Sequence, residues 1–129
     1  FSLALQPQIE MHTGKLVGFE ALLRWCHPTK GQISPAEFIP LLESTSFMLE
    51  LDYWVIARST HLIREFKNNG YADIKIAINL SAGQFLDPTL PEFLQQQIIK
   101  KRMPLPWLTK MLRYLSKIKM LMTSLLIRC

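Results

Sequence analysis

Cysteine is scarce in this 129-residue sequence, which contains only Cys26 and Cys129. Two cysteines cannot build the disulfide framework of a small secreted protein, so we expect a reducing, cytoplasmic location. No stretch of about 18 uninterrupted apolar residues occurs, so no transmembrane helix is predicted. The first residues, FSLALQPQI, lack both a basic leader and a long apolar run, so a signal peptide is not expected.

Acidic residues are absent from the end of the sequence, where none follows Glu92. Residues 1–99 contain seven Lys or Arg and all ten Asp or Glu, whereas residues 100–129 contain eight Lys or Arg and no acid. The formal charge of +5 therefore comes from the last thirty residues, and only they suggest an anionic partner such as nucleic acid or a membrane surface. These residues lack the interleaved aromatic side chains of a single-strand binder, so we expect no nucleic-acid partner.

The composition is that of a globular protein, with 49% apolar and 19% charged residues, and this excludes a disordered chain. Apolar residues predict strands over 3–9 and 16–25. Gly14 lies between them and can adopt the positive φ angle that a tight reversal needs. The two strands are therefore expected to form a hairpin.

A helix is expected to begin at Pro35, because Ser34 can cap it and Glu37 completes a capping box. The order of strands and helices along the chain indicates an α/β layered architecture. The other expected elements are a helix over about 49–68, a strand over 74–78, a helix over about 91–101 and an amphipathic helix from Trp107.

One predicted strand carries an unusual set of side chains. Within VGFEALLRW, Glu20, Leu22 and Arg24 share one face, because successive side chains on a strand alternate. Glu20 and Arg24 lie about 13 Å apart at roughly 3.3 Å per residue, so they would not pair directly. The face is either an exposed surface with two solvated charges or a site for a metal ion, an apolar ring and a phosphate.

Asn79 stands where the predicted strand 74–78 ends. Asparagine at the end of a strand is typical of a turn. Its side-chain carbonyl oxygen could instead bind a hard cation, which prefers oxygen ligands. The residue pattern alone leaves both interpretations open.

A set of short motifs lies along the first hundred residues. The set comprises Gln6-Pro7, Glu20-Ala21-Leu22, Arg24-Trp25, Pro28, Pro35 with Phe38-Ile39-Pro40, Glu43, Trp54-Val55 and Asn79-Leu80-Ser81. Their order and spacing over about residues 3–99 resemble the N-terminal part of the EAL domain, a family that hydrolyses the bacterial second messenger cyclic di-GMP. The resemblance implies a (β/α)₈ barrel whose first strand is antiparallel, and the predicted hairpin fits that arrangement.

The resemblance also implies a site for Mg²⁺ or Mn²⁺ in which Glu20 and Asn79 are metal ligands. Oxygen ligands suit both ions. Arg24 would hold a phosphate of the dinucleotide, since a planar guanidinium matches phosphate oxygens, and Leu22 would pack near a base. The implied nucleotide-contacting residues are Gln6, Leu22, Arg24 and Asp52.

The later part of the family pattern is missing from this sequence: a glutamate-rich strand, two adjacent aspartates, a catalytic lysine and further glutamates. One carboxylate and one amide cannot hold two metal ions and activate a water molecule. We therefore expect an EAL domain truncated after about residue 100, catalytically incompetent alone and without its metal. The alternative is a degenerate cyclic di-GMP-binding or self-association module in bacterial signalling, with weak ligand binding.

The expected fold is a partial (β/α) barrel of EAL type, with about three strands, flanking helices and a C-terminal amphipathic helix. An incomplete EAL domain over 1–99 would precede a non-matching basic tail over 100–129. A frameshift or recombination near residue 100 would explain the tail, and the source DNA tests this by showing whether another reading frame restores an acidic strand.

Three strands cannot close an eight-stranded barrel, so a sheet edge and an apolar face would be exposed. We expect the tail helix or a second copy of the chain to cover them, which predicts a homo-oligomer. A basic amphipathic helix can also bind a membrane surface, but that interpretation is less favoured here.

Overall fold

The computed structural model describes residues 1–100, and the chain divides into two compact units, residues 1–84 and 85–129. The amphipathic helix predicted from Trp107 and nearly all of the basic tail lie outside the described residues. Within the described part, no helix combines the length and the apolar character needed to span a bilayer.

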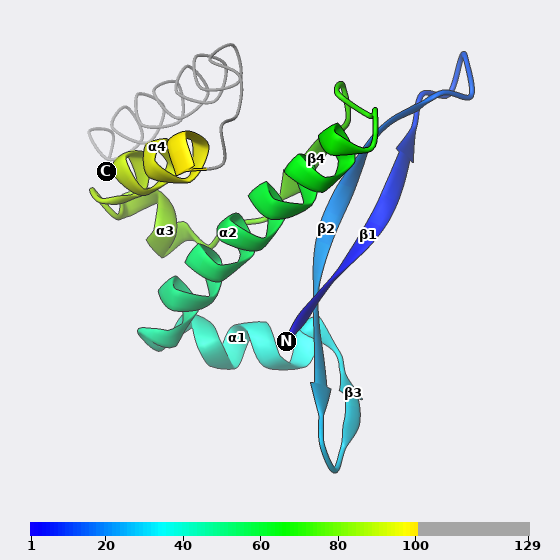
Figure 1. The fold of residues 1–129 in the computed structure, drawn as a ribbon. Coiled ribbons are helices and arrows are strands. Elements are labelled where there is room, and N and C mark those ends of the chain that lie inside the picture. The colour runs from blue at the N-terminus through cyan, green and yellow to red at the C-terminus, as the bar shows by residue number, and fades with distance from the viewer. Residues whose placement is uncertain (101–129) are drawn as a thin grey trace, which may run out of the picture. The chain divides into compact units, whose positions relative to one another are not determined.

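The first unit opens with the predicted hairpin. Strands β1 (Ser2–Ile9) and β2 (Leu16–His27) pair antiparallel, and Gly14 in the connecting turn has a φ of 68° (Figure 1). This φ lies in the left-handed region that glycine adopts without steric cost. The hairpin prediction is confirmed, although β2 extends two residues beyond the expected end.

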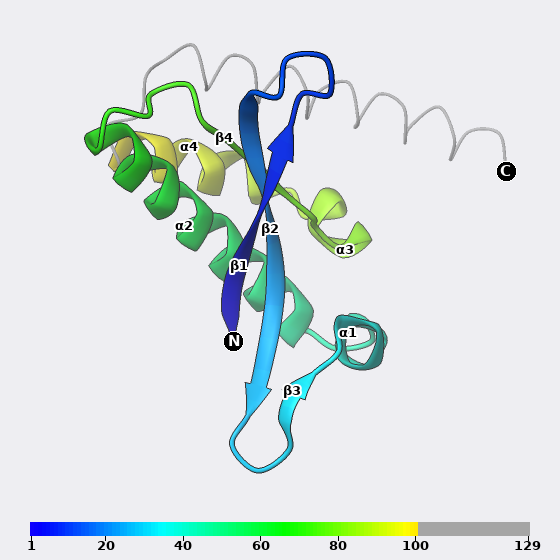
Figure 2. The same ribbon diagram turned by 90° about the vertical axis from the view of Figure 1, so that its right-hand side faces the viewer.

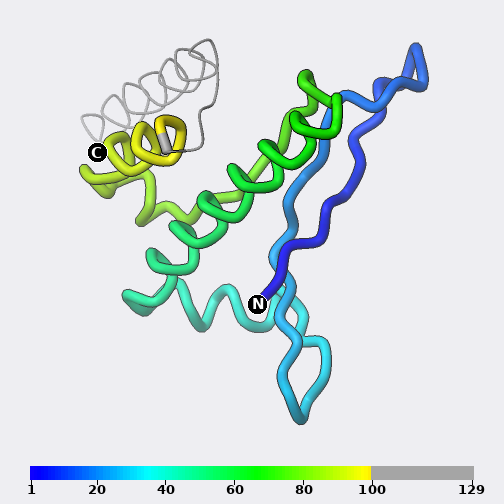
Figure 3. Tube along the Cα trace, in the orientation of Figure 1, coloured from blue at the N-terminus to red at the C-terminus, as the bar shows by residue number. Residues whose placement is uncertain are grey.

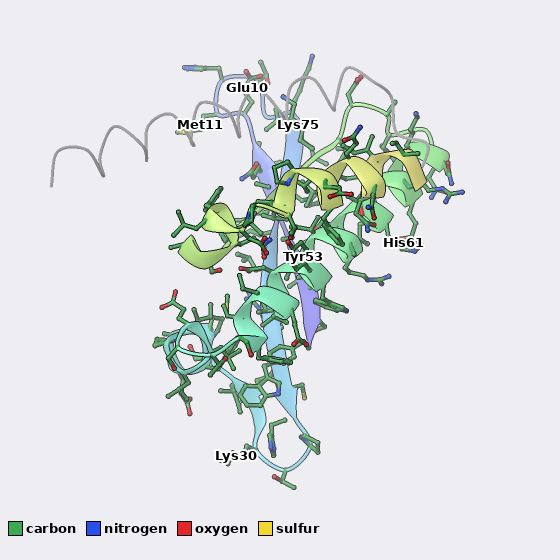
Figure 4. All side chains as sticks on the ribbon, turned by 90° about the vertical axis from the view of Figure 1, so that its left-hand side faces the viewer. Glu10, Met11, Lys30, Tyr53, His61 and Lys75 are labelled. Carbon is green, nitrogen blue, oxygen red and sulfur yellow. The ribbon has the colours of Figure 1, made fainter. Side chains whose placement is uncertain are left out.

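The far end of β2 forms a second, unexpected hairpin. Residues Trp25 to His27 pair antiparallel with β3 (Gly31–Ile33). Figure 4 shows Lys30 at the tip of this hairpin, at the opposite end of β2 from Glu10 and Met11. Strand β3 has only three residues, too few for a recognisable alternation of apolar side chains.

Two helices return the chain to the sheet. Helix α1 (Pro35–Glu43) and helix α2 (Phe47–Asn68) lead to β4 (Lys75–Ile78), which pairs with β2 in parallel (Figure 3). A parallel pair needs a crossover connection of this length. The predicted order of strand, helix and strand is therefore confirmed.

The capping box predicted for α1 is wrong. The helix begins at Pro35 as expected, but the side chain of Ser34 makes no capping hydrogen bond. Instead, the backbone N–H groups of Glu37 and Phe38 donate to the Ser34 carbonyl oxygen at 2.9 and 3.2 Å. Proline at the first position removes one free N–H, so the helix can start without a side-chain cap.

Helix α2 supplies most of the core of the first unit. It lies along one face of the sheet (Figures 1 and 2), and it ends at the Asn69-Gly70 pair that predicted its stop, where Gly70 has a φ of 90°. Its inward side buries apolar residues at helical spacing. The buried apolar residues of the first unit are Ala21, Phe38, Met48, Leu51, Val55 and Ile56.

Two further helices follow β4. Helix α3 (Ala82–Leu86) is a single short turn that the sequence did not predict, because five residues show no helical period. Helix α4 (Leu90–Lys100) belongs to the second unit and matches the predicted helix within one residue at each end. Its side chains Leu90, Leu94 and Ile98 are buried and share one face, as their four-residue spacing requires.

Candidate functional site

The site is built on β2, which lies between β1 and β4 in the sheet. Glu20, Leu22 and Arg24 are all half-buried, so this face is not the fully solvated surface that was one of the two interpretations. The intervening Ala21 is buried, with 3% of its surface exposed. Leu22 and Arg24 on this face therefore border partly enclosed space.

Glu20 and Asn79 lie in contact. The Asn79 Nδ2 atom donates to the Glu20 Oε1 atom at 2.8 Å, although the residues are 59 positions apart in the sequence. The parallel register explains this contact, because Glu20 is opposite Ala77 and Asn79 follows two residues later at the carboxyl end of β4. The structure thus brings together the two residues that the resemblance implied as metal ligands.

A pocket of about 290 Å³ adjoins this pair. Four of the expected site residues line it, namely Leu22, Arg24, Asp52 and Asn79, whereas Glu20 and Gln6 are not part of the lining. Gln6 is exposed on β1, directly opposite Glu20 in the hairpin register. The rest of the lining is mainly apolar: Ala21, Leu23, Pro35, Ile39, Met48, Val55 and Leu80.

The pocket contains one carboxylate that the site prediction did not include. Glu43, the last residue of α1, lines the pocket together with Arg24. The sequence placed Glu43 among the motifs but gave no physical signal for a site role, because its distance from β2 depends on how α1 folds back. Within the described residues, Arg24 forms no salt bridge, and its Nη1 atom donates to the Leu23 carbonyl oxygen at 3.0 Å.

Asp52 occupies the most enclosed position of the expected residues. Only 2% of its surface is exposed, and its Oδ2 atom accepts hydrogen bonds from the Ser81 backbone N–H at 3.1 Å and from the Ser81 hydroxyl. Burial raises the pKa of the Asp52 carboxyl above its ordinary value, and the two Ser81 hydrogen bonds oppose that rise.

The donor set suits a divalent cation only in part. Glu20 and Asn79 offer carboxylate and amide oxygens of the kind that Mg²⁺ and Mn²⁺ bind. Among residues 1–100, however, no group of three or more His, Cys, Asp or Glu side chains is arranged to hold a metal ion. The pair therefore fits a cation that keeps several of its water ligands, as Mg²⁺ commonly does.

Comparison with known proteins places these features in one family. The EAL domain model matches residues 1–112. Two relatives are from Pseudomonas aeruginosa: the bifunctional diguanylate cyclase/cyclic di-GMP phosphodiesterase MucR is 37% identical over 95 residues, and the cyclic di-GMP phosphodiesterase PA2567 is 41% identical over 92 residues. These matches cover 74% and 71% of this chain but only 14% and 16% of those proteins.

Solved structures agree with the sequence matches. The phosphodiesterase PaMucR in complex with c-di-GMP superposes with a TM-score of 0.74 at 36% identity, over 78% of this chain and 41% of that one. The FimX EAL domain gives a TM-score of 0.70 at 30% identity, over 80% of this chain and 41% of that one. The predicted fold class is confirmed, while the domain boundary near residue 100 stays a prediction. The chain belongs to the EAL domain family, related to cyclic di-GMP phosphodiesterases, and spans part of the EAL fold.

Proposed function

We propose that the 129-residue chain binds cyclic di-GMP weakly in the pocket beside Glu20 and Asn79 and does not hydrolyse it. The contact between these two side chains carries the proposal, because it joins a carboxylate on β2 to an amide at the carboxyl end of β4 and so forms a polar pair that neither strand holds alone. Ligands of α/β folds commonly bind at the carboxyl ends of parallel strands.

The pocket chemistry suits one half of a cyclic dinucleotide. Arg24 has guanidinium N–H groups beyond the one that donates to Leu23, and a guanidinium forms strong, charge-assisted hydrogen bonds with phosphate oxygens. Leu22 and the apolar lining offer a surface for a base. A pocket of about 290 Å³ is at the small end of ligand sites, which supports weak binding.

EAL phosphodiesterases are metal-dependent, and a bound divalent cation would polarise a phosphate oxygen and lower the pKa of a bound water molecule. Glu20 and Asn79 are the residues of this chain that would hold such a cation. The hydrogen bond between them keeps the two side chains in contact at the carboxyl end of β4. Gln6, opposite Glu20 on β1, would contact the nucleotide from the neighbouring strand.

We expect no hydrolysis of cyclic di-GMP because few carboxylates lie near Glu20 and Asn79. Within residues 1–100 no larger cluster of metal-binding side chains accompanies Glu20, and residues 101–129 contain no Asp or Glu at all. A two-metal mechanism needs several carboxylates to hold both ions and to position the attacking water. This chain therefore supplies binding groups without the full set for hydrolysis.

Calorimetry of the purified chain with cyclic di-GMP, in the presence of Mg²⁺ or Mn²⁺, tests the proposal. We expect weak binding that Arg24→Ala reduces at least about tenfold, the loss of roughly one charge-assisted hydrogen bond. Arg64→Ala removes an exposed arginine from α2, outside the pocket, and should leave binding unchanged.

Two results would overturn the proposal. No heat at high micromolar ligand would remove the binding claim. Hydrolysis of cyclic di-GMP by the wild-type chain, abolished in Glu20→Ala, would show that the chain is catalytically competent.

Self-association is a second candidate function. Among the described residues, β4 pairs with β2 on one side only, so its other edge presents unpaired backbone groups. Such an edge is a template for pairing with another chain. Sedimentation equilibrium should detect dimers or larger species, and a monomer mass at every concentration tested would exclude this candidate.

A cytoplasmic location forms part of the proposal. Cys26 is a free, exposed thiol, and exposed thiols persist in the reducing cytoplasm. Fractionation of cells that express the chain tests the location, and recovery from an oxidising compartment would contradict it.

A further inference from the structure

The carboxylate of Asp52 is buried inside the first unit. It lies on α2, only 2% of its surface is exposed, and its Oδ2 atom accepts two hydrogen bonds from Ser81. Removing a carboxylate from water is costly unless hydrogen bonds compensate. The two bonds therefore hold Asp52 in place and, equally, hold residue 81 at a fixed distance from α2.

Ser81 is fixed from a second direction as well. Its Oγ atom accepts a hydrogen bond from the Gln84 backbone N–H at 3.3 Å, at the start of α3. The hydroxyl thus donates to Asp52 and accepts from α3, which uses its single hydrogen and one lone pair. Ser81 is consequently attached to two helices at once.

Ser81 lies two residues after Asn79, the candidate metal ligand. Strand β4 ends at Ile78 and α3 begins at Ala82, so residues 79–81 form the whole connection. Asn79 is anchored on one side by the pairing of β4 with β2 and on the other, through Leu80, by Ser81. Its amide reaches Glu20 from this short connection.

Asp52 was expected to touch the nucleotide itself, and its placement suggests a different role. It lines the pocket, but the Oδ2 atom is already occupied by both Ser81 donors.

We propose that Asp52 is a positioning residue that acts through Ser81 to hold Asn79 against Glu20. The proposal deepens the proposed function and rests on it, because the position of Asn79 matters only if the pair binds a ligand or a cation. The contacts that carry it lie entirely within the first unit, and they connect α2, the turn after β4 and β2.

Three variants of the 129-residue chain separate this role from simple stabilisation. Asp52→Ala removes the acceptor, whereas Asp52→Asn can place its side-chain oxygen where Oδ2 now accepts both bonds. Ser59→Ala is the matched control, because Ser59 is also on α2 and 3% exposed, and its hydroxyl has no hydrogen-bond partner among the described residues.

The primary measurement needs no ligand. In the ¹H–¹⁵N NMR spectrum, the side-chain amide signals of Asn79, identified by their loss in Asn79→Leu, report its contact with Glu20. We expect Asp52→Ala to move these signals, Asp52→Asn to return them close to the wild-type position, and Ser59→Ala to leave them in place. If Asp52→Ala does not fold, Ser81→Ala, which keeps the backbone N–H donor, provides the milder test and should move the signals part of the way.

A second measurement uses Mn²⁺ alone as the probe, through paramagnetic broadening of signals near Glu20. Loss of a residue that orients a metal ligand commonly weakens metal binding 10- to 100-fold, so we expect at least a tenfold loss in Asp52→Ala and recovery in Asp52→Asn. Failure of Mn²⁺ to bind the wild-type chain would contradict the cation part of the proposed function, while the Asn79 signals would still decide the positioning role.

The proposal is overturned if the Asn79 signals stay unchanged in Asp52→Ala and Ser81→Ala. It is equally overturned if Asp52→Asn moves the Asn79 signals as much as Asp52→Ala does. Asp52→Asn keeps the oxygen that accepts from Ser81, so the proposal requires the signals to stay close to their wild-type position.

Discussion

Gly18 is the position at which a single added methyl group should separate the two strands of the site. It is buried on β2 opposite Lys75 of β4, and a Cβ atom built there would lie 2.7 Å from the Lys75 carbonyl oxygen. Ordinary contacts begin at 3.4 Å, so Gly18→Ala requires a shift of about 0.7 Å between the two backbones. Because the obstacle is backbone, no side-chain rotation can relieve it.

The size of the effect follows from two opposing contributions. Overpacking of this kind costs about 1–3 kcal/mol, and replacing glycine by alanine recovers about 0.4–1 kcal/mol by restricting the unfolded chain. We expect Gly18→Ala to lower the free energy of unfolding by about 1–2 kcal/mol. At about 4–8 °C per kcal/mol for a small domain, the melting temperature should fall by at least about 4 °C.

Thermal and urea unfolding followed by circular dichroism would measure this loss. Gly83→Ala is the matched control, because its new Cβ atom would meet the Leu49 Cδ2 atom at 3.5 Å and the Ser81 Oγ atom at 3.9 Å, both ordinary contacts. Gly83 lies within α3, where alanine should raise stability by about 0.5–1 kcal/mol. The reasoning is refuted if Gly18→Ala is as stable as the wild type, or if the two variants respond alike.

Three other perturbations probe the interior. Gln84→Leu should keep or raise stability by about 1 kcal/mol, because the fully buried Gln84 amide has no hydrogen-bond partner among the described residues, and a loss in chemical denaturation would instead indicate a bridging water. Burial raises the pKa of the Asp52 carboxyl in the folded state above its ordinary value of about 4. The protonated carboxyl therefore contributes its full stabilisation below about pH 4, and this stabilisation is lost as the pH rises through the folded-state pKa. Asp52→Asn should therefore gain stability relative to the wild type as the pH rises above about 4, and a constant difference in urea midpoints would contradict the shift. Ile56→Ala, at a side chain 1% exposed, should cost about 2–5 kcal/mol in the same assay, and a loss below 1 kcal/mol would mean that α2 is not packed as described.

The parts of the fold that could be predicted are those with a local signal. Gly14 marked the first hairpin, and Asn69-Gly70 marked the end of α2. Strand β3 and helix α3 were missed because three and five residues are too short to show a period.

The candidate site depended much less on local signals. Alternation placed Glu20 and Arg24 on one face of β2, but nothing in the residue pattern indicates that Asn79 would reach Glu20, since that contact depends on the parallel register of β4. The EAL resemblance supplied that pairing. The burial of Asp52 had a detectable signal, because it stands beside Leu51 and three residues before Val55 on the inward side of α2.

The contact between Glu20 and Asn79 closes a loop of 59 residues, and this has a consequence for how the site appears during folding. Closing a flexible loop of that length costs about 4 kcal/mol of chain entropy before any contact compensates it. A single hydrogen bond contributes only about 1 kcal/mol, so the pair cannot form in an otherwise unfolded chain. The site should therefore exist only in molecules whose crossover helices have already folded, and the fraction of chains able to bind a ligand should equal the fraction that is folded.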